Sequence, residues 1–154
     1  MVLRVQCTEA AAGMIRRLAA LHGPLMFHQS GGCCDGSAPM CYPAREFRVG
    51  AQDGLMGEIE GAAFWMGAAQ FEYWEHTQLI IDVVPGRGSG FSLEAPEGVR
   101  FLTRSRVFTD DEAAELRAAY DVWWDSVQPL LVNEKVPLAP VNPFKTLFEK
   151  QFGK

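Results

Sequence analysis

Cysteine and histidine side chains cluster in the stretch FHQSGGCCDGSAPMCYP, residues 27–43. Thiolate and imidazole groups bind soft or borderline ions such as zinc, iron or copper(I), and their ligand sets often begin with a close pair of cysteines. We therefore expect a metal or cluster site on this glycine-rich segment. Its leading ligands are Cys33, Cys34, Cys41 and His28. Asp35 or Glu72 can add a carboxylate oxygen.

Two other interpretations of the same stretch stay open. Buried free cysteines in a tight glycine turn are common, because cysteine is among the residues most often buried. A thiolate whose pKa is lowered near His28 or His76 could instead attack an aldehyde or a thioester. The adjacent pair Cys33 and Cys34 matches no standard zinc finger, since neighbouring side chains diverge.

The aromatic segment QFEYWEHTQLIIDVV, residues 70–84, is a second candidate for a functional surface. Its first half alternates, which predicts a strand with one polar face that lines a pocket. That face comprises Gln70, Glu72, Trp74 and His76. A helix would instead make Glu72 and His76 neighbours, but the β-branched run that follows favours a strand. A solvated face and a core histidine are the alternatives.

The glycine-rich stretch PGRGSGF, residues 85–91, predicts a tight turn between strands. It lacks the Gly-x-Gly-x-x-Gly order of a dinucleotide site and the lysine of a phosphate loop. Arg87 at its tip is placed to meet an anion.

Two helices and a series of short strands must position these residues. Thr8 and Thr109 are N-cap residues for helices over 8–21 and 110–124, and Gly23-Pro24 ends the first. Short apolar runs between Gly, Pro or Asp predict strands. These strands are 25–28, 46–49, 55–59, 63–66, 78–84, 90–93 and 99–107. The fold class is α+β, a small twisted, mostly-β sheet or partial barrel with an N-terminal helix, a closing helix and an extended C-terminal tail.

Composition limits the function classes. A chain of 154 residues suits one domain with a real core, and its net charge of −5 argues against a nucleic-acid partner. No apolar run approaches the roughly 18 residues of a membrane span. The N-terminus has no signal-peptide pattern, so we expect a cytoplasmic protein with reduced thiols. All four lysines follow residue 134, which divides the chain into a body, 1–117, and an appendage, 118–154.

The segments PLMFHQSGGCCDGSAPMCYP, QFEYWEHTQLIIDVVPGRGSGFSLE and GVRFLTRSR resemble a family of short bacterial proteins described as domain of unknown function 779. The resemblance covers about residues 2–117. Genes of that family often lie beside aldehyde dehydrogenase genes. It therefore implies an accessory role in aldehyde or alcohol metabolism, with an aldehyde dehydrogenase as a partner, and not the dehydrogenase reaction itself.

The run TEAAAGMIRRLAALHG, followed by a strand and GGCCDG, and the later IIDVVPGRGSGFSLEAPEG are similar to the HesB class of iron–sulfur carriers. That likeness implies a HesB-like domain and an iron–sulfur cluster, with Cys33 at the carriers' first cluster cysteine. The carriers' later Cys-Gly-Cys is missing here. Cys34, Cys41 and His28 would then take the place of its two ligands.

The C-terminal stretch, residues 120–153, resembles the tail of bacterial arylsulfatases. It carries none of the sulfatase nucleophile or calcium motifs, so the likeness does not imply that activity. Four prolines block one continuous helix, and the many large apolar side chains need burial. We expect a strap on the chain's own body or on the mate of a homodimer, or a fused segment without a place on the body.

Overall fold

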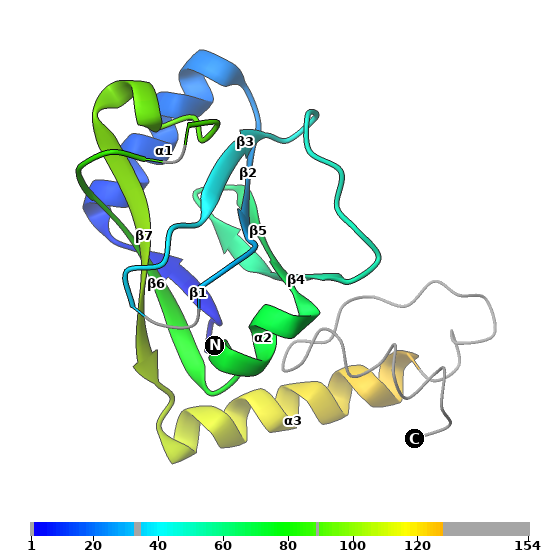
Figure 1. Ribbon diagram of the computed structural model, residues 1–154. Coiled ribbons are helices and arrows are strands. Elements are labelled where there is room, and N and C mark those ends of the chain that lie inside the picture. The colour runs from blue at the N-terminus through cyan, green and yellow to red at the C-terminus, as the bar shows by residue number, and fades with distance from the viewer. Residues whose placement is uncertain (1, 33–34, 89, 128–154) are drawn as a thin grey trace. The chain divides into compact units, whose positions relative to one another are not determined.

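The computed structural model describes residues 2–32, 35–88 and 90–127 (Figure 1). The chain forms two compact units. The larger unit spans residues 3–107, and the described part of the smaller one comprises Val2 and residues 108–127. The predicted C-terminal strap, residues 128–154, lies outside the described residues.

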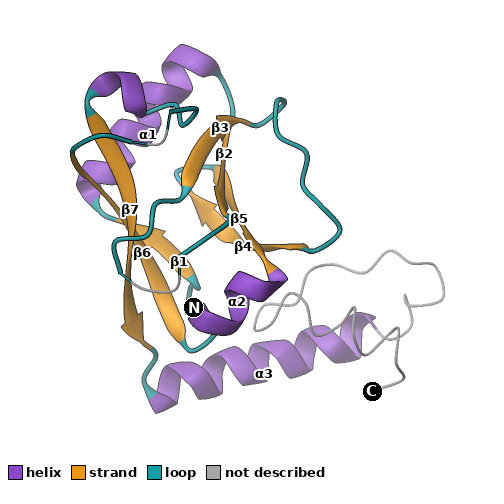
Figure 2. Ribbon diagram, viewed as in Figure 1, coloured by secondary structure: helices purple, strands orange, loops and turns teal. Residues whose placement is uncertain are grey.

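The larger unit contains two mixed sheets (Figure 2). The first has the order β1-β6-β7 and comprises β1 (Val5–Cys7), β6 (Thr77–Pro85) and β7 (Val99–Val107). The second has the order β3-β2-β5-β4 and comprises β3 (Met40–Pro43), β2 (Leu25–Gln29), β5 (Ala62–Gly67) and β4 (Asp53–Ile59). In each sheet one pair is parallel, β1 with β6 and β2 with β5.

The hydrophobic core of the larger unit includes a group of phenylalanines from both sheets. The ring of Phe27 in β2 meets the ring of Phe101 in β7 edge-on, with centroids 5.0 Å apart, and lies 6.0 Å from that of Phe64 in β5. None of the three is exposed to solvent. Because Phe27 and Phe101 belong to different sheets, this contact joins the two sheets through their apolar faces.

Helix α1 (Glu9–His22) follows β1 and begins as its sequence predicts. The Thr8 hydroxyl accepts a hydrogen bond from the N–H of Ala11, and Gly23 ends the helix at φ 78°. Its buried residues include Ile15 and Leu18, which lie three apart on one face. The helix therefore combines an N-cap, an apolar stripe and a glycine C-cap in one local sequence.

Two further helices and one short turn of 3₁₀ helix complete the described chain. They are α2 (Ala68–Trp74), η1 (Ala95–Glu97) and, in the smaller unit, α3 (Asp110–Val127). At the start of α3 the Thr109 hydroxyl accepts from the N–H of Glu112, and the Glu112 carboxylate accepts from the N–H of Thr109. This reciprocal pair is a capping box. No helix among the described residues has the length and apolarity to cross a bilayer.

The predicted α+β class is confirmed, with helices beside mixed sheets and no closed barrel in the described part of the chain. The strands predicted at 46–49 and 90–93 are wrong, because both segments form loops and turns. Strands β1 and β3 were not predicted.

The predicted strand over residues 70–76 is also wrong, because helix α2 begins at Ala68. Phe71 and Trp74, three residues apart, are buried, whereas the intervening Glu72 and Tyr73 are exposed. This spacing has the helical period, and the alternation of the sequence in this segment was coincidental.

Candidate functional site

His28 and Asp53 meet on one face of the four-stranded sheet. His28 in β2 lies opposite Trp65 in β5, and Asp53 in β4 lies opposite Gly67, two residues further along β5. Side chains two apart on a strand point to the same face, so both polar groups project over β5 on the same side. Gly67 places no side chain between them; a Cβ atom there would lie 3.8 Å from Oδ1 of Asp53.

Both ring nitrogens of His28 have side-chain partners. Nε2 lies 2.9 Å from Oδ1 of Asp53, and Nδ1 lies 2.5 Å from Oγ of Ser30. The other carboxylate oxygen of Asp53 accepts the N–H of Gly50 at 2.7 Å, which fixes the orientation of the carboxylate. A carboxylate only accepts hydrogen bonds, so the proton of a neutral ring belongs on Nε2 and the Nδ1 lone pair accepts the Ser30 hydroxyl. We call His28, Ser30 and Asp53 the His28 centre.

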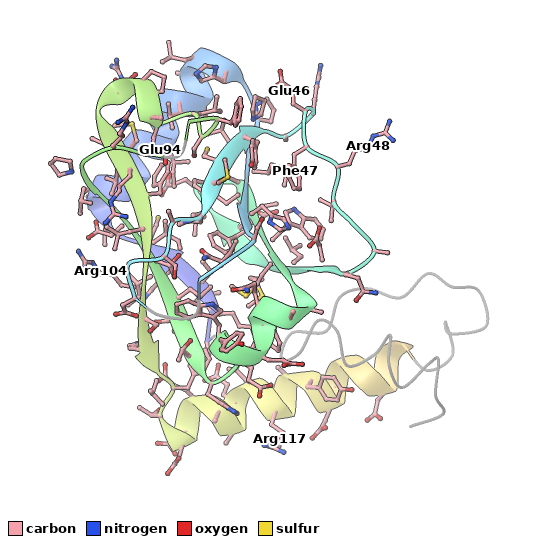
Figure 3. All side chains as sticks on the ribbon, viewed as in Figure 1. Glu46, Phe47, Arg48, Glu94, Arg104 and Arg117 are labelled. Atoms are coloured by element: carbon pink, nitrogen blue, oxygen red, sulfur yellow. The ribbon has the colours of Figure 1, made fainter. Side chains whose placement is uncertain are left out.

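Aromatic side chains border the His28 centre. The ring of Phe47 lies 5.0 Å from the His28 ring, and Tyr42 of β3 stacks on Phe47 at 4.8 Å. In Figure 3, Arg48 extends away from the body of the protein beside Phe47. His28 itself is only 7% exposed, whereas Ser30 at the end of the strand is exposed. The imidazole is thus shielded, whereas the residue whose hydroxyl it accepts from is exposed.

A buried polar pair connects the two sheets on the opposite, core-facing side of β2. The hydroxyl of Thr103 in β7 donates to Oε1 of Gln29 at 2.9 Å, and both residues are fully buried. The amide of Gln29 donates in turn to the carbonyl of Gly31. Because Gln29 lies between His28 and Ser30, this pair fixes the backbone at the His28 centre.

The same region holds both flanks of the cysteine segment, which we define as residues 30–37. Ser37 bridges to β7, with its carbonyl accepting the N–H of Thr103 at 2.7 Å. Trp74 of α2 donates its indole N–H to the carbonyl of Gly32 at 3.3 Å. The hydroxyl of Ser105 donates to Asp35 at 2.6 Å.

Gly32 has φ 88°, where side chains are rarely found, and a Cβ atom there would lie 2.0 Å from Oγ of Ser37. Glycine is therefore required at this position of the cysteine segment.

The predicted ligands do not all converge. Cys41 lies opposite Phe27 and therefore faces the core, whereas its neighbour Met40 pairs with His28 on the other face. Cys41 is fully buried, and burial, followed by the nearby Glu94 carboxylate, raises the pKa of its thiol far above the usual value. The structure consequently places Cys41 and His28 on opposite sides of the sheet.

Cys33 and Cys34 lie outside the described residues, so their role as ligands stays a prediction. Asp35 is exposed and bonded to Ser105, as described above. No group of three or more His, Cys, Asp or Glu side chains within the described part of the chain is arranged to hold a metal ion.

The residues of the predicted pocket wall do not share a face. Trp74 is 2% exposed in the core, and Glu72 is exposed on helix α2. His76 lies beyond the helix, exposed, with Nε2 3.2 Å from a Glu75 carboxylate oxygen. Gln70 keeps a buried Oε1 for which the described residues offer no hydrogen-bond partner. Arg87 is exposed in the loop after β6.

Sequence reasoning missed several polar groups of this site. Asp53 gave no local signal, since it reaches His28 across an intervening strand. Ser30 did carry a local signal in the sequence, because a hydroxyl two residues after a strand histidine lies within reach of that histidine. Glu94 is 1% exposed in the core; it accepts the Ser92 hydroxyl and, at 3.3 Å, the N–H of Phe101.

Comparison with known proteins gives one family. The model of the family described as Domain of unknown function (DUF779) matches residues 14–107, which is more than half of the chain. The matched range contains the whole His28 centre and the cysteine segment. No curated protein sequence matches the chain. The chain therefore belongs to the DUF779 family.

Proposed function

We propose that this protein is an accessory protein of aldehyde or alcohol metabolism that binds zinc, iron or an iron–sulfur cluster through its cysteine segment. His28 supplies the nitrogen ligand, and Cys33 and Cys34 supply the thiolates. The observation that carries the proposal is the hydrogen bond of 2.9 Å between His28 and Asp53. Metal-bound histidines usually donate their second N–H to a carboxylate, which orients the ring and raises its basicity.

The ligand set differs from the one that the sequence suggests. Because Cys41 faces the core, it leaves the set, and Nδ1 of His28 becomes the coordinating nitrogen in exchange for its bond to Ser30. The likeness to HesB carriers supports a cluster as one occupant. The proposal places the protein in the cytoplasm, where thiolate ligands stay reduced.

Elemental analysis and an absorption spectrum of anaerobically purified protein test the proposal. We expect stoichiometric metal in the wild type and its loss in Cys33→Ser/Cys34→Ser and in His28→Gln. Cys7→Ser is the matched control, because Cys7 is a free cysteine in β1, away from the segment. Metal-free wild-type protein with reduced, unoxidised thiols would contradict the proposal.

A small thiol-dependent enzyme is the second candidate, and the same pair of residues favours it. An imidazole oriented by a carboxylate is the usual base for a cysteine nucleophile, which would attack an aldehyde or thioester. Alkylation by iodoacetamide across pH separates the two candidates. An enzyme should show a thiol in the cysteine segment that titrates well below about 8.5 without bound metal. Ordinary titration of both thiols would rule against it.

The third candidate is a non-catalytic partner of an aldehyde dehydrogenase, which the family resemblance suggests. Tyr73 and Phe91 are 63% and 88% exposed, and exposed aromatic side chains are common contact residues in interfaces. Co-purification with the enzyme, compared between the wild type and Tyr73→Ser/Phe91→Ser, tests this candidate. Light scattering of the purified chain tests the expected homodimer.

A further inference from the structure

We propose that the His28 centre is a serine-type acyl-hydrolase site, with Ser30 as nucleophile, His28 as general base and Asp53 as the residue that orients the base. This activity goes beyond metal or thiol chemistry, because it needs neither a metal ion nor a cysteine. The three roles correspond to the hydrogen bonds of the centre, from hydroxyl to imidazole and from imidazole to carboxylate. Such a constellation is recognised by geometry and not by the order of its residues along the chain.

The geometry supplies the nucleophile–base contact and the base–carboxylate contact that this chemistry uses. Oγ of Ser30 lies 2.5 Å from Nδ1 of His28, within reach for direct proton transfer. Nε2 lies 2.9 Å from Asp53, which holds the proton on the far nitrogen and leaves the Nδ1 lone pair toward the hydroxyl. Asp53 is itself fixed by the N–H of Gly50. The base is therefore held in the orientation and tautomer that activate Ser30.

The surroundings of the centre favour a small, uncharged acyl group. Ser30 is exposed, and a Cβ atom on the adjacent Gly31 would meet no atom of the other described residues within 4 Å, so that position is uncrowded. Phe47 borders the imidazole and Tyr42 stacks on Phe47. An apolar wall next to a polar nucleophile suits a short-chain ester or thioester.

The reaction balances with water as the only co-reactant. Oγ of Ser30 bonds to the acyl carbon and its proton passes to Nδ1 of His28. The acyl–oxygen or acyl–sulfur bond of the substrate then breaks, and the leaving alcohol or thiol takes that proton. Water attacks the acyl-serine, gives a proton to Nδ1, and releases the carboxylic acid while the proton returns to Oγ.

A fluorophosphonate probe followed by peptide mapping tests the assignment on the full chain. We expect one adduct, on Ser30, and hydrolysis of p-nitrophenyl acetate that falls about 100-fold or more in Ser30→Ala and His28→Gln. Both signals should persist in the wild type with chelator present, which removes a bound metal and leaves Ser30 in place, so this proposal and the metal proposal can fail separately.

Two matched controls accompany these variants. Ser105→Ala removes a hydroxyl that is bonded to a carboxylate, Asp35, but has no histidine. His76→Gln removes an exposed histidine that pairs with a carboxylate but no serine. Neither should change labelling or hydrolysis.

The labelling pattern decides the proposal. The absence of an adduct on Ser30 in folded, chelator-treated wild-type protein would overturn it, and so would labelling that is unchanged in folded His28→Gln and Asp53→Asn. Because Ser30 is exposed, Ser30→Ala should fold normally and keeps the test decisive if the other variants unfold.

Discussion

Replacing Thr103 by valine should destabilise the larger unit by about 1–3 kcal/mol, the cost of leaving a buried polar atom without its partner. The two side chains have nearly the same shape, so the change removes the hydroxyl and creates no large cavity. Oε1 of Gln29 then loses the bond of 2.9 Å and stays buried, because Gln29 and Thr103 are both 0% exposed.

Urea unfolding followed by tryptophan fluorescence measures this change in the free energy of unfolding. Thermal unfolding should shift in parallel, by about 4–8 °C for each kcal/mol in a domain of this size. Ser105→Ala is the control, because it removes a hydroxyl from the same strand whose partner, Asp35, is exposed. It should change stability by less than about 0.5 kcal/mol.

A double-mutant cycle with Gln29→Met completes the test. When both partners become apolar, neither member of this pair is left buried without the other, so the double variant should be less destabilised than the sum of the single variants by about 0.5–3 kcal/mol. Strictly additive effects, or a Thr103→Val variant as stable as the wild type, would refute the claim that this pair joins the two sheets.

Three further predictions follow from individual contacts. The variant Cys33→Ser/Cys34→Ser keeps two thiols, Cys7 and Cys41. Ellman's reagent should modify Cys7 in the native protein but Cys41 only after unfolding in guanidinium, because Cys41 is fully buried. Rapid reaction of both thiols in the native protein would contradict the buried position of Cys41. Burial tends to raise the pKa of Asp82, but hydrogen bonds from Arg104, Thr8 and the N–H of Val83 outweigh burial and hold it below its usual value. The stabilisation from Asp82 is therefore present above about pH 4 and lost as the pH falls through the lowered pKa. The melting temperature of Asp82→Asn should consequently fall less steeply in acid than that of the wild type, and equal slopes would count against this account. Gly32→Ala should lower the free energy of unfolding by about 1–3 kcal/mol, because the backbone there has a positive φ and a Cβ atom would clash with Ser37. Gly31→Ala should leave stability unchanged, because a Cβ atom there has open space. Equal melting temperatures for the two variants would contradict this prediction.

Local sequence signals were sufficient for the starts of the two long helices and for most strands. Thr8 and Thr109 cap their helices through hydrogen bonds to the third following residue, an interaction that needs nothing beyond one turn of chain. Strand β7 has the predicted bounds, because its apolar and β-branched run is long and ends at a turn. Helix α2 was missed because a segment of seven residues is too short to distinguish the two periods reliably.

The candidate site depended on tertiary structure. The sequence determined that cysteines and a histidine cluster after a strand, that the chain has an α+β composition of elements, and where both long helices begin. Strand order and register alone decided that Asp53 reaches His28 across β5 and that Cys41 turns toward the core. The physical reason is the two-residue period of a strand: a shift of one position in pairing reverses the face of every side chain, and no local pattern fixes which distant strand lies alongside.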